Sequence, residues 1–104
     1  MNTVNIVGRI SQEIKTAQSK EGNAIANISI AVPKITNYKE ADFFKCTAFG
    51  KTAELISQYM KKGSRIGITG HLTVNKFKTK TGYDVESTEI IIDQVEFLEN
   101  KERG

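Results

Sequence analysis

The chain has few residues of several types, and each shortage narrows what it can do. Its 104 residues include one cysteine, one histidine, one proline and no tryptophan. Because Cys46 has no second cysteine to pair with, no internal disulfide can form, which fits a reducing cytoplasm. A zinc site needs three or four ligands, and Cys46 with His71 does not suffice. We therefore expect no bound metal.

Long apolar runs and catalytic arrangements are also missing. No stretch approaches the roughly 20 apolar residues that span a bilayer, and the N-terminus shows no secretory signal. Around His71 there is no strained nucleophile turn or other sign of acid–base catalysis. There is no glycine-rich, phosphate-cradling loop followed by Lys-Ser or Lys-Thr. We expect a cytoplasmic protein without membrane contact, without a cofactor and without enzymatic activity.

Charge is unevenly distributed along the chain. The net charge is +3, but residues 51–80 carry seven basic side chains and one acidic one. Residues 81–104 carry seven acidic side chains and two basic ones. This division predicts one positive and one negative surface, and a positive surface suits a polyanion. An ordinary solvated charge distribution is the alternative, and charge alone favours it.

Alternation of apolar and polar residues predicts five strands. They cover residues 4–10, 24–32, 41–51, 65–77 and 85–98. Residues 11–23 are predicted to be a polar connection. In the fourth strand we expect Ile66, Ile68, Leu72 and Val74 to face inward. The glycines at 67 and 70 suggest a coil or a bulge, as a closing barrel requires.

One helix is predicted between the third and fourth strands. Thr52 is its expected N-cap, and Lys61 and Lys62 are expected in its last turn, where cations suit the helix dipole. Five strands with one helix in this place match an all-β, five-stranded Greek-key barrel, the oligonucleotide/oligosaccharide-binding (OB) fold. We expect one such domain over residues 1–98 and a short polar tail over residues 99–104.

The third strand has two different faces, because successive strand side chains point in opposite directions. One face is small and apolar, as a core or subunit contact should be, and carries Phe44, Cys46 and Ala48. The other mixes rings with a cation and a hydroxyl and carries Phe43, Lys45, Thr47 and Phe49. Such a mixture suits unpaired nucleic acid, because a ring offers a surface to a base and a cation binds phosphate.

A second aromatic and basic cluster lies at residues 76–80, Lys76-Phe77-Lys78-Thr79-Lys80. Phe77 stands between cations at the base of a predicted hairpin, where it serves no evident core. The functional interpretation is a stacking platform surrounded by phosphate-binding lysines. In the alternative, Phe77 packs under the hairpin or into a subunit contact. The rings of the third strand favour the functional interpretation.

Short segments run in a fixed order from about Asn2 to Leu98. They are NIVGR at 5–9, AIANISIA at 24–31, FGKTAE at 49–54, YMKKGS at 59–64, GHL at 70–72 and TEII at 88–91. No single segment is decisive, but the ordered set resembles the bacterial and phage single-stranded DNA-binding protein family. The resemblance implies an OB fold, usually in homotetramers, that wraps single-stranded DNA without strong sequence preference in replication, recombination and repair.

The resemblance also assigns roles to residues. The stacking positions fall on Phe43, Phe49 and Phe77, and Tyr38 lies close to a further family aromatic. Arg9, Lys45 and Lys76 fall near phosphate in the family. Further cations expected along the path are Lys51, Lys62, Arg65, Lys78 and Lys80. Phe44 and Asn5 are the residues expected at the subunit interface.

Two departures from the family pattern alter these expectations. Asp84 and Glu86 stand where family members often carry a basic and an aromatic residue, so part of the DNA path is expected to be weaker. The family's acidic, partner-docking terminus is absent from this chain, either naturally or by trimming. A small dimeric primosome-type OB protein, which mainly holds other replication proteins, is the alternative function. Its mass in solution distinguishes it from a tetramer.

Overall fold

The computed structural model describes residues 1–98, which form six strands and one helix. The strands are β1 (Val4–Ile10), β2 (Lys15–Gln18), β3 (Ala24–Pro33), β4 (Ala41–Phe49), β5 (Arg65–Lys78) and β6 (Asp84–Phe97). The helix α1 (Gly50–Tyr59) lies between β4 and β5. The tail expected over residues 99–104 lies outside the described residues.

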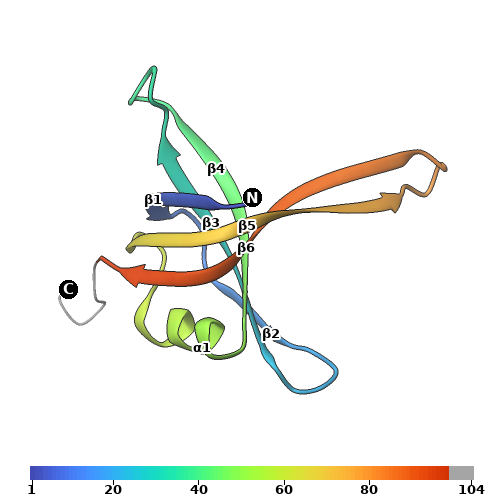
Figure 1. Ribbon diagram of the computed structural model, residues 1–104, viewed down its shortest axis with the longest axis horizontal. Helices are drawn as coiled ribbons and strands as arrows, with labels where there is room; N and C mark the ends of the chain where they lie inside the picture. The colour runs from blue at the N-terminus through green and yellow to red at the C-terminus, as the bar shows by residue number, and fades with distance from the viewer. Residues whose placement is uncertain (99–104) are drawn as a thin grey trace.

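One sheet curls until it meets itself (Figure 1). Its strand order is β1-β5-β6-β4-β3-β2, and Arg9 and Ile10 of β1 also pair with Ala31 and Ile30 of β3. That extra pairing closes β1, β5, β6, β4 and β3 into a ring. The only parallel pairing among the described strands joins β4 to β6. The predicted OB-fold barrel, with its helix before the β5–β6 pair, is confirmed.

The strand β2 lies outside the ring and pairs with the first half of β3. The prediction of a purely polar connection over residues 11–23 is wrong at this point. All four residues of β2 are exposed, so no buried side chain imposes an alternating pattern on its sequence. Its backbone hydrogen bonds to β3 define the strand, and the sequence does not display them.

The core consists mainly of β-branched residues, which suit a pleated and buried surface. Its largest fully buried side chains include Ile10, Ile30 and Ile66 from the barrel and Ile56 and Met60 from the helical segment. Helix α1 packs against β3, β4 and β6 and lies below the barrel in Figure 1. The rings of Tyr59 and Phe97, with centroids 5.8 Å apart, join the end of the helix to the end of β6.

The helix differs from its predicted form at both ends. It begins at Gly50 with no side-chain cap, so Thr52 lies inside it and is not its N-cap. It ends at Tyr59, so Lys61 and Lys62 follow the helix and are not in its last turn. Ala53 and Ile56 are the buried residues of the helix, and its last backbone hydrogen bond runs from the Met60 N–H to the Ile56 carbonyl over 2.9 Å.

The strands β5 and β6 extend far beyond the barrel as a long hairpin (Figure 1). A bulge between Thr69 and Gly70 confirms the irregularity expected from the glycines. A Cβ at Gly70 would lie 2.1 Å from the Ile91 carbonyl oxygen, so only glycine allows this approach. Leu72 and Val74 were expected to face the core, yet they are 45% and 50% exposed. The hairpin is already leaving the barrel at these residues.

Candidate nucleic-acid interface

The three predicted stacking rings are large and solvent-exposed. The exposed fractions are 66% for Phe43, 49% for Phe49 and 51% for Phe77. Phe43 and Phe49 alternate outward on β4, away from the buried Cys46 and Ala48. Phe77 stands on β5 opposite Val85 of β6. Because β4 and β5 are the two neighbours of β6 in the sheet, exposed rings are available on both sides of β6.

A row of hydrogen bonds crosses the sheet between these rings. Asn75 Nδ2 donates to Glu89 Oε1 over 2.9 Å. The Thr47 hydroxyl lies 2.9 Å from Glu89 Oε2 and 3.0 Å from Asn27 Oδ1. A hydroxyl has one proton, so it donates to one of these oxygens at a time. Because Thr47 shares its face with Phe43, and Asn75 with Phe77, the row shows that the rings belong to one continuous face.

Two further aromatic side chains lie in the turns. Tyr38, predicted from the family position, is 80% exposed in the turn between β3 and β4. Tyr83 is 73% exposed in the turn between β5 and β6. Sequence reasoning missed Tyr83, although its position beside the Thr81-Gly82 turn was visible. Both rings are therefore open to solvent, and neither lies on a strand.

The predicted phosphate-binding cations are all exposed and fall into three groups. Lys45 and Lys51 lie on β4 and α1, within the reach of the rings at either end of β4. Arg9, Lys62 and Arg65 gather where the chain leaves α1 and enters β5. Lys76, Lys78 and Lys80 lie on or near the tip of the hairpin. The structure thus spreads the cations over the molecule and does not collect them in one patch.

The hairpin lysines are partly compensated by acidic residues. Lys76 pairs with Glu86 across the ladder, with Nζ and Oε1 3.8 Å apart, and Lys78 pairs with Asp84. Both lysines point away from the face that carries Phe77, because adjacent strand residues alternate. The acidic residues that depart from the family pattern therefore lie opposite the lysines and not beside the ring.

The model of the single-strand binding protein family matches residues 1–98. The chain belongs to this family. A single-stranded DNA-binding protein of Oceanobacillus iheyensis is 37% identical over 97% of this chain and 65% of its own length. Single-stranded DNA-binding protein B of Bacillus subtilis is 32% identical, and the match covers 98% of this chain and 94% of the relative.

A further relative is single-stranded DNA-binding protein 1 of Clostridium acetobutylicum. It is 36% identical over the whole of this chain and 99% of its own length. The chain thus spans less than two thirds of the Oceanobacillus protein, but nearly all of the Bacillus and Clostridium ones. The resemblance inferred from the short ordered segments is confirmed.

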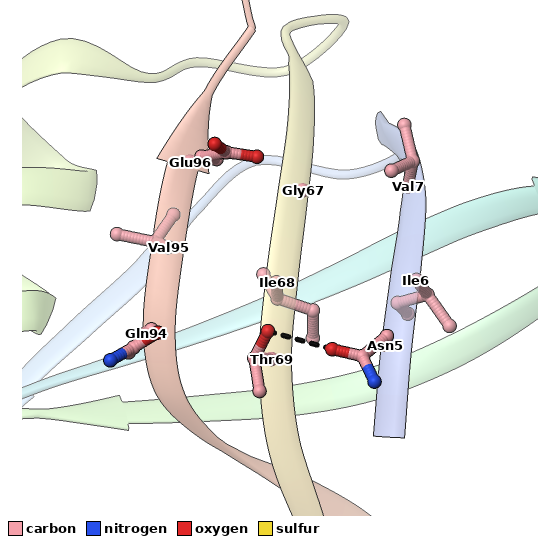
Figure 2. Close-up of a pocket in the computed structure, with 9 residues that line it drawn as sticks. All are labelled: Asn5, Ile6, Val7, Gly67, Ile68, Thr69, Gln94, Val95 and Glu96. Atoms are coloured by element: carbon pink, nitrogen blue, oxygen red, sulfur yellow. Dashed lines mark hydrogen bonds between the residues drawn. The ribbon is translucent and has the colours of Figure 1, made fainter. Parts of the chain in front are cut away.

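The two residues expected at a subunit interface lie on different faces of this family member. Asn5 is exposed on β1 and accepts a hydrogen bond from the Thr69 hydroxyl over 2.8 Å. It lines a hollow of about 400 Å³ on the outward face of β1, β5 and β6. In Figure 2 Gly67 lies between Val7 and Glu96. Phe44, in contrast, is half-buried and packs against the core. Asn5 is therefore open to a second copy of the chain, whereas much of Phe44 is covered by the core of its own barrel.

Two further groups lie beneath or on this face, and the hydrogen-bonded row uses neither. The Cys46 thiol is buried beneath it, and burial, followed by the nearby Glu89 carboxylate, raises its pKa to about 12. His71 Nδ1 lies 3.0 Å from Asp93 Oδ2 on the outward side of the β5–β6 pair. No group of three potential metal ligands occurs within residues 1–98. Over the same range, no helix has the length and hydropathy of a membrane span.

Proposed function

We propose that the protein binds single-stranded DNA with little sequence preference and that bases stack on Phe43, Phe49 and Phe77. The observation that carries this proposal is the continuous outward face on which the hydrogen-bonded row links the three exposed rings. A ring stacks on any base, so a surface of rings tolerates every sequence. Tyr38 is the fourth ring that we assign to this surface.

Phosphate binding accompanies the stacking. We assign this role to Arg9, Lys45, Lys51, Lys62, Arg65, Lys76, Lys78 and Lys80. Each cation that contacts a phosphate releases counterions, so the affinity falls as the salt concentration rises. The wide spacing of the cations supports a strand that runs over several faces of the barrel. The protein acts by binding and not by catalysis, in the cytoplasm, and covers single strands during replication, recombination and repair.

Self-association completes this proposal. Within the described chain only Arg9 and Ile10 of β1 pair with β3, which leaves the Val4–Gly8 edge without a second neighbouring strand. An open edge is a template for another strand. The hollow beside Asn5 and Val7 covers the face of β1, β5 and β6 next to this edge. We infer that two copies meet there and that a homotetramer forms, with a dimer as the alternative, which the mass in solution decides.

Titration of an oligothymidine tests the stacking assignment. Phe43→Ala and Phe77→Ala should each weaken binding by roughly 1–3 kcal/mol, and the double variant by more. The matched control is Val74→Ala, because Val74 is on the same strand as Phe77, is equally exposed and points to the other side of the hairpin. The stacking proposal is wrong if the double variant binds as tightly as the wild type.

A further inference from the structure

A small pocket lies on the interface face between Phe43 and Phe49. Its volume is about 110 Å³, and it opens beside the hydrogen-bonded row. The polar side chains that line it come from four strands and include Lys15, Asn27, Ser29, Lys45, Thr47 and Glu89. The pocket therefore combines two carboxylates, those of Glu89 and of the exposed Glu13, with small polar groups and with two lysines that belong to different strands.

The rings leave this part of the face without a stacking surface. Phe43 and Phe49 are six residues apart on β4, which is about 20 Å in a strand, whereas stacked bases lie about 3.4 Å apart. A DNA strand that touches both rings must therefore pass Lys45 and Thr47, which lie between them on the same face of β4. The base at this point needs contacts other than a ring. Hydrogen bonds to its edge are the contacts that the pocket provides.

Glu89 is the unexpected member of this pocket. A carboxylate on a face that binds a polyanion repels phosphate, but it accepts hydrogen bonds from base amino groups. One oxygen of Glu89 accepts from Asn75, and the other lies within reach of the Thr47 hydroxyl. An ionised carboxylate has about four acceptor sites, so these partners leave room for a donor from a base.

We propose that this pocket is a base-edge subsite that favours a base with an exocyclic amino group, with Glu89 as the acceptor. It rests on the proposed binding of single-stranded DNA and adds a modest preference at one position of the path. Cytosine carries an N4 amino donor where uracil and thymine carry a carbonyl oxygen. The Glu89 carboxylate attracts the amino group of cytosine and repels the carbonyl oxygen of uracil or thymine. Lys15 and Lys45 at the rim are placed for the flanking phosphates.

A purely structural role for Glu89 is the competing explanation. In that case it only joins β4, β5 and β6 through Thr47 and Asn75. Glutamine separates the two roles, because it keeps the shape and can accept from Asn75 but no longer presents two charged acceptor oxygens. Its amide group can serve either an amino group or a carbonyl oxygen. Glu89→Gln should therefore remove the base preference and leave the fold intact.

The experiment compares oligodeoxycytidine with oligodeoxyuridine of equal length at pH 8, at one fixed salt concentration. The measured quantity is the ratio of the two dissociation constants, so general effects of charge on affinity cancel. Glu89→Gln should lower the preference for the cytidine strand by about tenfold relative to the wild type. Glu54→Gln, which changes the charge equally on the exposed side of α1, should leave the ratio within about twofold of the wild type.

Several results overturn the proposal. It is wrong if Glu89→Gln keeps the wild-type ratio, or if Glu54→Gln lowers the ratio as much. Thermal melting shows whether the Glu89 variant folds. If the variant does not fold, the proposal is tested with the wild-type protein alone. Replacing uridines by cytidines in the oligonucleotide must then tighten its binding to the wild type, and unchanged binding contradicts the proposal. If the wild type binds neither strand, the proposed binding of single-stranded DNA is itself wrong. This outcome is distinct from equal binding of both strands, which contradicts only the base-edge subsite.

Discussion

Lys76 and Glu86 face each other across the β5–β6 ladder, with Nζ and Oε1 3.8 Å apart, on the side of the hairpin opposite Phe77. The same face carries the Lys78–Asp84 pair one step further along. An exposed pair of this kind contributes only about 0–1 kcal/mol to stability. Its larger effect is on binding, because each acidic residue reduces the positive potential that its lysine offers to phosphate.

Removing the acidic partner should strengthen the attraction of the hairpin for DNA. In Glu86→Gln, Lys76 becomes available to a phosphate, and the slope of log affinity against log salt should steepen by about 0.7. The melting temperature should change little, because both side chains are largely exposed. Titration of an oligothymidine at several salt concentrations measures the slope. Glu54→Gln is the control for net charge, and an equal change in both variants would contradict a local effect.

Arg65 provides the complementary prediction at the other end of the barrel. It faces Arg9 across the β1–β5 ladder, and like charges directly opposite are unfavourable, so its removal should not destabilise the fold. Arg65→Gln should make the salt slope shallower by about 0.7 with a long oligonucleotide. The start of β5 is twelve residues, or about 40 Å, from Phe77. With a short oligonucleotide that covers only the hairpin, the salt slope should therefore be the same in Arg65→Gln as in the wild type. An equal change of the slope with both lengths would contradict a DNA path that runs from the hairpin to Arg65.

The parts of the fold that could be predicted are those with strong alternation. The strand predicted over residues 4–10 agrees with β1, because Ile6, Gly8 and Ile10 turn inward along its whole length. The exposed β2 gave no such signal. The limits of α1 depend on the contacts of Ala53 and Ile56 with other elements, which a cap residue in the sequence cannot reveal.

The candidate site was predictable only one strand at a time. The rings of β4 could be assigned to an outward face because alternation within one strand suffices. The row through Asn27, Thr47, Glu89 and Asn75 depends on how four strands are aligned, and one residue of slippage would turn a strand's side chains to the other face. The same holds for Lys76 and Glu86, ten residues apart in the sequence and opposite each other in the hairpin.

The glycines of β5 give a matched pair of stability predictions. A Cβ at Gly70 would lie 2.1 Å from the Ile91 carbonyl oxygen, whereas one at Gly67 would meet its nearest atom, Val7 Cγ2, at 3.5 Å. Gly70→Ala must displace the β6 backbone and should lower the free energy of unfolding by about 2–3 kcal/mol. Gly67→Ala makes an ordinary contact and should change it by less than about 1 kcal/mol. Urea unfolding of both variants at equal protein concentration measures the difference, and equal losses would contradict the bulge geometry.

The buried thiol of Cys46 predicts how stability changes in alkaline solution. Its pKa rises from 9.0 to about 12 in the folded protein, chiefly through burial. Between these values the unfolded chain loses the thiol proton while the folded chain keeps it, so the free energy of unfolding falls as pH rises. The loss should be about 1.4 kcal/mol for each pH unit above 9 and should end near pH 12.

Other groups also titrate above pH 9, so the contribution of Cys46 is measured against Cys46→Ala. The alanine variant should be less stable than the wild type at pH 7, because the missing sulfur leaves a small cavity of the kind that costs about 1 kcal/mol. Since only the wild type has a thiol to ionise, the gap between the two proteins should shrink from pH 9 and close by about pH 10. Urea unfolding at each pH follows the gap, and a constant gap from pH 7 to pH 11 would show that the folded state does not hold the thiol neutral.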